Sequence, residues 1–260
     1  IKDYERTVSE LYKYIQIGVA AETLARYFPI VPWQEEVRSH EWRVGAIHEL
    51  PLQNSIDSTI EMLSQDTLLD IIKNFLFFRV EFGNATKVIT RYMQYRATNS
   101  MVERVIGNLK GEVDKNRGLI WHWQGSGKTL TMIFAANKLY YMKDLENPTI
   151  FFIVDRIELE DQLYKEFYSL DLVEPEIIGT VSELKELLKF DDYRSKRGVF
   201  IILIHKFRPE ELKEVYGELE KVSKRKATIM NRKNVIAFVD EGHRTQYGLL
   251  AAQMKAVLKN

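Results

Sequence analysis

The chain has 260 residues, of which 45% are hydrophobic and 28% charged, a composition typical of a globular protein with a sizeable core. It carries 37 basic and 37 acidic residues, so its net charge of zero gives no global sign of a nucleic-acid or membrane partner. It has no cysteine, which excludes a disulfide framework, a thiolate zinc site and a cysteine nucleophile, and fits a cytoplasmic protein.

Residues 1–85 are predicted to form a helical N-terminal region. The segment 7–28 places apolar residues at roughly helical spacing, namely Leu11, Ile15, Val19 and Leu24. Two prolines then interrupt the pattern at Pro29 and Pro32. A second break at 50–54 precedes the segment 55–63, and a third helix is predicted over 66–78, with Asp66 as its cap and apolar residues around most of its circumference.

Residues 86–260 show a different pattern, in which short apolar runs alternate with helical stretches. Strands are predicted at 118–123, 149–155, 176–181, 199–207 and 235–242. Helices are predicted between them at 129–142, 158–169, 182–190 and 209–222. Continuous apolar strands separated by helices indicate an α/β domain with a mostly parallel sheet covered on both faces. No apolar run approaches the ~20 residues of a membrane span, so no membrane partner is expected.

A glycine-rich stretch, 122-HWQGSGKT-129, resembles a phosphate-binding loop in which His122 replaces the first glycine. Such loops work because their backbone N–H groups surround phosphate oxygens, while a lysine neutralises charge and a hydroxyl holds magnesium. Gly125, Gly127, Lys128 and Thr129 fill the second half of this pattern. A predicted strand before the loop and a predicted helix after it favour a nucleotide site over a chance match.

Two adjacent carboxylates, Asp240 and Glu241, end the predicted strand 235–242. Ligands bind at the carboxyl-terminal edge of a parallel sheet, so both side chains are expected beside the glycine loop. One carboxylate can hold Mg²⁺ and the next can orient the attacking water. The pair and the loop together predict a nucleoside triphosphatase.

The combination of HWQGSGKT, FFIVDRIELEDQL and VDEGHRTQYG resembles the motor (R, restriction) subunit of type I restriction–modification enzymes. These proteins belong to the superfamily 2 DExH translocases, and histidine is usual at position 122 in that family. The stretch 91–105, RYMQYRATNSMVERV, is similar to the family's adenine-contacting segment, with Gln94 at the matching glutamine. The resemblance covers roughly residues 60–250.

The resemblance implies a first RecA-like motor lobe that binds and hydrolyses ATP with Mg²⁺. Gly125, Ser126 and Gly127 would surround the phosphates, and Lys128 would contact the β- and γ-oxygens. Thr129 and Asp240 would bind magnesium, and Glu241 would position the attacking water. Gln94 would recognise adenine. In the whole subunit, hydrolysis would drive translocation of double-stranded DNA before cleavage, in a complex with methyltransferase (M) and specificity (S) subunits.

Other residues match the family's motifs for DNA contact or for coupling between sites: Arg156, Gln162, Lys206 and His243. The stretch 221–233 holds six basic residues and no acidic one, so it is either a phosphate-contacting loop or a solvated, mobile loop. Trp121 and Trp123 flank the histidine of the loop. They are expected to lie on a strand with their side chains in the protein core, rather than to form a base-stacking surface.

The family's nuclease motif and second motor lobe are not visible in the sequence, and the chain begins with Ile rather than Met, so a fragment is expected. Two other functions stay open at this point. One is a lobe of a DNA-repair DExH helicase. The other is a non-catalytic assembly module that docks to the methyltransferase and specificity subunits.

Overall fold

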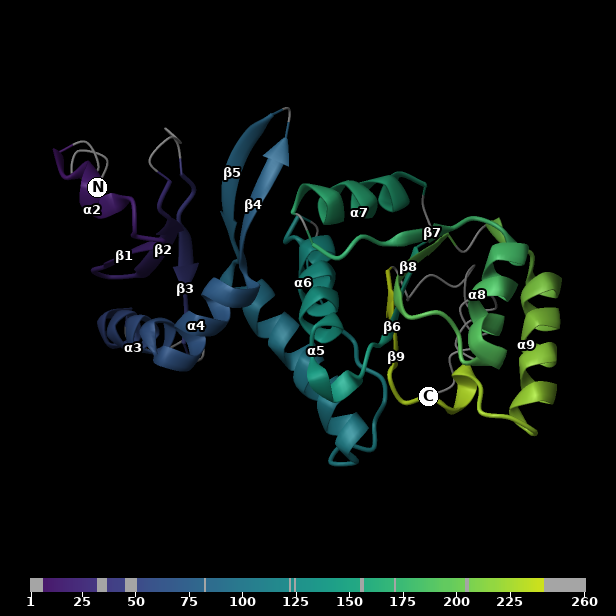
Figure 1. The fold of residues 1–260 in the computed structure, drawn as a ribbon. Coiled ribbons are helices and arrows are strands. Elements are labelled where there is room, and N and C mark those ends of the chain that lie inside the picture. The colour runs from purple at the N-terminus through teal and green to yellow at the C-terminus, as the bar shows by residue number, and fades with distance from the viewer. Residues whose placement is uncertain are drawn as a thin grey trace. The chain divides into compact units, whose positions relative to one another are not determined.

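A computed structural model describes residues 7–31, 37–44, 51–81, 83–121, 123, 125–154, 157–170, 172–203 and 206–240 (Figure 1). The chain divides into two compact units. One unit comprises residues 1–98 with 169–171, and the other comprises residues 99–168 with 172–260. The boundary at residue 98 falls inside a single helix, α5 (Tyr92–Lys110).

The first unit combines a three-stranded antiparallel sheet with helices and a hairpin. The short helix α2 (Ser9–Tyr12) precedes the sheet, whose strands are β1 (Ile17–Ala21), β2 (Ala25–Pro29) and β3 (His40–Trp42) in the order β1-β2-β3. After it come α3 (Pro51–Leu63), α4 (Gln65–Asn74) and the antiparallel hairpin of β4 (Leu76–Glu81) and β5 (Asn84–Ile89).

The predicted helix over 7–28 is wrong beyond Tyr12, because this segment forms β1 and β2. In β2 burial alternates with a period of two: Ala25 and Tyr27 are buried, whereas Arg26 between them is exposed. Gly18 pairs with Phe28, and the Phe28 ring occupies the space where a side chain at position 18 would lie. Cross-strand pairing therefore outweighs the approximate helical spacing of the apolar residues.

The predicted helix over 66–78 is correct only up to Asn74. Its cap position is Ser64 rather than Asp66, which lies in the first turn. The following aromatic and β-branched residues leave the helix and pair as β4 with β5, in the register Leu76↔Ile89 to Glu81↔Asn84. The helical N-terminal region is therefore a mixture of helices and strands.

Aromatic side chains form the centre of the first unit. Tyr27, Trp42 and Phe75 are fully buried, and the Trp42 ring lies 5.6 Å from Tyr27 and 5.1 Å from Tyr95 between centroids. Their polar atoms have partners: the Tyr27 hydroxyl donates to the Thr90 carbonyl at 2.6 Å, and Trp42 Nε1 donates to Glu61 at 3.1 Å. Burial without these partners would cost about 1–3 kcal/mol for each polar group.

The second unit contains the parallel sheet that the sequence predicts. Its strands are β6 (Thr149–Val154), β7 (Glu176–Ile178), β8 (Gly198–Leu203) and β9 (Val235–Val239), in the order β7-β8-β6-β9 with every pair parallel. The intervening helices also match the predicted positions: α6 (Lys128–Tyr140), α7 (Ile157–Ser169), α8 (Val181–Tyr193) and α9 (Pro209–Ser223). The unit is thus an α/β fold with a parallel four-stranded sheet.

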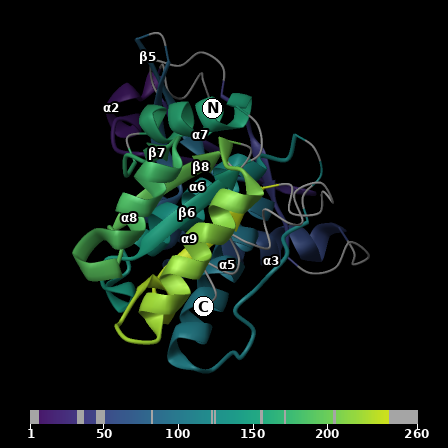
Figure 2. The same cartoon turned by 90° about the vertical axis from the view of Figure 1, so that its right-hand side faces the viewer.

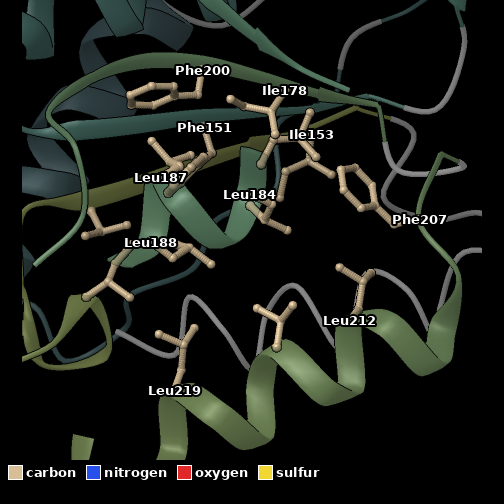
Figure 3. Packing of buried hydrophobic residues seen from close by; sticks show 14 of the residues in the cluster. Phe151, Ile153, Ile178, Leu184, Leu187, Leu188, Phe200, Phe207, Leu212 and Leu219 are labelled. Carbon is tan, nitrogen blue, oxygen red and sulfur yellow. The ribbon is translucent and has the colours of Figure 1, made fainter. Parts of the chain in front are cut away.

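The two faces of β6 are buried against different elements. Phe151 and Ile153 point into an apolar cluster formed with α8 and α9, which includes Leu184 and Leu212 (Figure 3). Phe152 points to the other face, where its ring makes an edge contact with Phe167 of α7 at 5.4 Å. Helix α6 lies on the face opposite to α8 and α9 (Figures 1 and 2). Burial on both faces explains why these strands are continuously apolar.

The strand predicted at 118–123 is not formed by the described residues of that segment. Trp121 and Trp123 are 87% and 77% exposed, so the expectation that they lie in the core is also wrong. The described sheet has β7 and β9 at its edges, and neither pairs with this segment. Because a strand exists only through its pairing, an apolar sequence without a partner strand stays extended and exposed.

Candidate functional site

The glycine loop forms a tight turn at the beginning of α6. Gly125 and Gly127 have φ angles of 77° and 87°, which are left-handed values that favour glycine. Between them, the backbone N–H and the hydroxyl of Ser126 donate to the Trp123 carbonyl at 3.2 and 2.7 Å, respectively. A Cβ added at Gly125 would meet no atom within 4 Å, so the space beside this glycine is open.

Helix α6 starts directly from the loop, with Gly127 as its cap residue and Lys128 as its first residue. The backbone N–H and the hydroxyl of Thr131 both donate to the Gly127 carbonyl, at 3.1 and 3.0 Å, which fixes the first turn. Lys128 and Thr129 are half-buried, and within the described part of the chain the Lys128 ammonium makes no ion pair. The positive end of the helix dipole therefore coincides with a lysine that no carboxylate of the described residues neutralises, an arrangement that favours an anion.

Asp240 lies at the carboxyl-terminal edge of the sheet. It follows directly after β9, and its backbone N–H donates to the Ile153 carbonyl at 3.1 Å, level with the end of the neighbouring strand β6. The residue is half-buried. In parallel sheets this edge is where ligands bind. Glu241 and His243, the predicted neighbours of Asp240 in the site, lie outside the described residues.

Lys206 follows β8 at the same edge and contacts a carboxylate that the sequence reasoning missed. Its ammonium lies 3.2 and 3.3 Å from the two carboxylate oxygens of Glu160 on α7. Glu160 is only 7% exposed, whereas Gln162 on the same helix is exposed. Arg156 lies outside the described residues.

A sequence signal for Glu160 was nevertheless present. Leu163 and Phe167 are both fully buried, and Glu160 precedes them by three and seven residues on the same helix. That spacing places the carboxylate on the apolar stripe of α7. A charged residue on such a stripe predicts a buried partner of opposite charge.

Gln94 belongs to the first unit and is 3% exposed. It lies in the first turn of α5, where its side-chain oxygen accepts a hydrogen bond from the backbone N–H of Arg91 at 2.9 Å. This contact satisfies a backbone donor at the helix start, as in one half of a capping box. The glutamine is therefore held in place before any ligand binds.

The donor set fits a nucleoside triphosphate with magnesium. The loop leaves open space at Gly125, Lys128 carries a positive charge, and Thr129 and Asp240 carry oxygen atoms of the kind that ligate magnesium. Among the described residues no group of three His, Asp or Glu side chains could hold a metal ion by itself.

Comparison with known proteins assigns the class. The family model for SWI2/SNF2 ATPases matches residues 93–260, which include Gln94, the glycine loop and Asp240. The chain is also 33% identical over its whole length to the candidate type I restriction enzyme MjaVIIIP endonuclease subunit of Methanocaldococcus jannaschii, of which it covers 25%. None of the described helices is long and apolar enough to cross a membrane.

Two further relatives carry the same description. The chain is 30% identical to the type I restriction enzyme HindI endonuclease subunit of Haemophilus influenzae, over 94% of the chain and 23% of that protein. It is 30% identical to the C-terminal part of the candidate MpnIIP endonuclease subunit of Mycoplasma pneumoniae, over 76% of the chain and 91% of that sequence. The chain therefore belongs to the endonuclease (R) subunits of type I restriction enzymes, and spans about a quarter of the length of the MjaVIIIP and HindI subunits.

Proposed function

We propose that this chain is the first RecA-like motor lobe of a type I restriction endonuclease subunit, preceded by a linker region that ends near residue 85. Its ATPase would drive translocation of double-stranded DNA before cleavage. The observation that carries the proposal is the loop at α6, where Gly127 begins the helix in a left-handed conformation and Lys128 follows without a carboxylate partner among the described residues. Asp240 on the carboxyl-terminal edge of the same unit supports it.

The nucleotide site would be formed by the glycine loop at the start of α6 and by Asp240 after β9. Gly125, Ser126 and Gly127 would surround the phosphates, the Ser126 N–H exchanging the Trp123 carbonyl for a phosphate oxygen, and Lys128 would neutralise charge on the β- and γ-phosphates. Thr129 and Asp240 would hold Mg²⁺. Bound ATP with Mg²⁺ supplies the transferable γ-phosphoryl group and a divalent charge beside it.

Two further residues would complete the site. Glu241, directly after Asp240, would orient the attacking water. Gln94 would recognise adenine through its amide NH₂ group, because its side-chain oxygen already accepts from Arg91. At the DNA side, Arg156, Gln162, Lys206 and His243 would contact the backbone or couple it to the nucleotide. The methyltransferase and specificity subunits would supply the recognition of the DNA sequence.

Lysine 128 provides the direct test. In the full-length protein assembled with its partner subunits, Lys128→Ala should abolish DNA-stimulated ATP hydrolysis, because the charge on the β- and γ-oxygens is no longer neutralised. Lys165→Ala, which removes an exposed lysine on α7, should leave that activity unchanged. Hydrolysis or translocation that persists in the Lys128→Ala protein would show that the nucleotide site is elsewhere.

The isolated chain offers a second test. Phosphoryl transfer in such motors commonly needs an arginine supplied from outside the lobe, a contribution of about 10³–10⁵ in rate. The chain alone should therefore bind ATP weakly and hydrolyse it slowly, and a turnover equal to that of the full-length protein would contradict this. If the chain binds the partner subunits but no ATP with Mg²⁺, it is an assembly module instead.

A further inference from the structure

A group of exposed cations lies at the amino-terminal edge of the sheet, opposite to the edge of Asp240. We call it the basic edge patch and define it as Lys221, Lys224, Arg225, Lys233 and Arg197. Lys221 lies in the last turn of α9, and Lys224 and Arg225 follow it by three and four residues, just beyond Ser223, the last residue of the helix. Lys233 lies two residues before Val235, the first residue of β9, and Arg197 immediately precedes β8.

The loop that carries these cations is held in place by hydrogen bonds. The backbone N–H groups of Arg225 and Lys226 both donate to the Val222 carbonyl at 2.9 Å. The side-chain amide of Asn231 donates to the carbonyls of Ser223 and Lys226, at 3.5 and 3.3 Å. Between these contacts, three residues are buried: Thr228, Ile229 and Met230. The stretch 221–233 is thus an anchored loop rather than the mobile one that its charge alone allows.

Arg232 joins the separate parts of the patch. Its guanidinium donates to the Thr149 hydroxyl at 3.0 Å, at the start of β6, and to the Arg194 carbonyl at 2.6 Å and the Ser195 hydroxyl at 2.7 Å, before β8. Thr149 is also paired with Gly198 and Val235, the first residues of β8 and β9. Arg197 and Lys233 therefore lie on the same edge as the end of α9.

Three acidic residues of this edge are already paired with other cations. Asp191 pairs with Arg194, Asp192 with Lys226 and Glu176 with Lys196. The five residues of the patch make no ion pair within the described part of the chain. Glu220, half-buried in the last turn of α9, and Glu146, exposed just before β6, offset at most two of the five charges, so the patch keeps a net positive charge.

Stabilisation of the helix end explains only part of this arrangement. Cations near a helix C-terminus interact favourably with its dipole, typically by about 0.3–1 kcal/mol each, and this accounts for Lys221 and Lys224. It does not account for Lys233 and Arg197, which precede strands rather than end the helix. A rigidly held group of uncompensated cations without exposed aromatic residues is suited to a row of phosphates, because phosphate contacts need charge and position but no base stacking.

We propose that the basic edge patch binds the phosphate backbone of double-stranded DNA, as a contact surface separate from the edge that holds the nucleotide loop. This rests on the proposed function, which takes duplex DNA as the substrate of the motor. The patch would bind DNA without sequence preference and without ATP. It would add affinity while leaving the hydrolysis step itself unchanged.

The test compares the salt dependence of DNA binding between full-length proteins. One variant carries Lys221→Gln, Lys224→Gln, Arg225→Gln and Lys233→Gln; the matched control removes four exposed lysines elsewhere, by Lys73→Gln, Lys115→Gln, Lys165→Gln and Lys213→Gln. Affinity for a non-specific duplex is measured without ATP between 50 and 200 mM salt. Each lost phosphate contact should reduce the slope of log K against log salt by about 0.9, so four contacts would change the affinity ratio between these salt concentrations roughly a hundredfold.

The outcomes are distinct. The proposal predicts a shallower slope for the patch variant than for both the control and the wild type. The melting temperature should fall only by the loss of the helix-end stabilisation that Lys221 and Lys224 provide, and the ATPase activity in the absence of DNA should be unchanged. An intermediate slope for the single variants Lys224→Gln and Lys233→Gln would support it further. Equal slopes for patch and control variants would overturn the proposal while leaving the proposed function intact. If the patch variant binds DNA normally but no longer binds a partner subunit, the patch binds an acidic protein surface and the proposal is overturned. A wild-type protein that binds no DNA would overturn both the proposal and the proposed function.

Discussion

The ion pair between Lys206 and Glu160 should contribute measurably to the stability of the second unit. Lys206→Met removes the ammonium but keeps the aliphatic length of the side chain, so Glu160 would remain buried without its partner. Breaking a buried pair in this way typically costs about 3–5 kcal/mol. Because the Lys206 side chain is 34% exposed, water can partly replace it, and a cost of about 2–3 kcal/mol is expected.

The measurement is thermal unfolding combined with amide hydrogen exchange on α7. For a domain of about 150–250 residues, a cost of this size lowers the melting temperature by roughly 5–10 °C. Glu160→Gln should cost less, about 1 kcal/mol, because the amide oxygen can still accept from Lys206. The double variant Lys206→Met with Glu160→Leu should recover most of the loss, because no buried charge remains.

A Lys206→Met protein within about 0.5 kcal/mol of the wild type would refute this reasoning, since the pair would then contribute no more than an exposed one. Faster exchange of α7 amides in Lys206→Met, with no change in the double variant, would locate the effect at Glu160. Loss of DNA affinity in the double variant, with stability recovered, would show that Lys206 contacts DNA as well.

Three other changes have expected outcomes. Gly125→Ala should weaken ATP binding, measured by titration calorimetry, because a φ angle of 77° costs a residue with a Cβ about 1–2 kcal/mol even where space is open. Equal affinity of the variant and the wild type would argue against a phosphate role for the loop. Tyr27→Phe should lower the free energy of unfolding by about 1–2 kcal/mol, because the Thr90 carbonyl loses its buried donor. Burial raises the pKa of the Tyr27 hydroxyl, so its hydrogen bond to Thr90 should persist in alkali. The backbone N–H groups of Gly179 and Thr180 lower the pKa of Glu183 below its usual 4.5. The capping box of α8 should therefore stabilise the helix above pH 4.5 and be lost as the pH falls through the lowered pKa. A protection factor of the Gly179 amide against hydrogen exchange that stays constant through this pH range would contradict the expectation.

The parallel sheet could be predicted because its strands carry their signal within themselves. Residues 149–154 and 198–203 are buried on both faces, so the sequence is continuously apolar there and no other pattern competes. The first unit could not be predicted in the same way. Strands β1 and β2 are short, and only β2 alternates in burial. The decisive information, the pairing of Gly18 with Phe28, lies in a contact between residues ten positions apart.

The proposed nucleotide site also has a part that local sequence predicts and a part that depends on distant contacts. The glycine loop is local, so its two left-handed glycines and the helix that follows were predictable from spacing alone. The strand expected before it was not formed by the described residues, because its existence depends on a neighbouring strand rather than on its own composition. The partner of Lys206 was missed for a similar reason: Glu160 is 46 residues away, and only its place on the buried face of α7 indicated a role.

The expected role of Lys206 in DNA contact is compatible with its ion pair to Glu160. The resemblance gives this lysine a role in DNA contact or coupling, whereas the structure places its ammonium against Glu160. An ammonium has three N–H donors, and with 34% of the Lys206 side chain exposed, not all of them need point at the carboxylate. A phosphate could bind only as an additional partner, because separating the lysine from a buried carboxylate would cost more than a solvent-exposed phosphate contact returns. Any DNA contact by Lys206 must therefore leave the ion pair intact, so Glu160 fixes the position from which the lysine can reach the backbone.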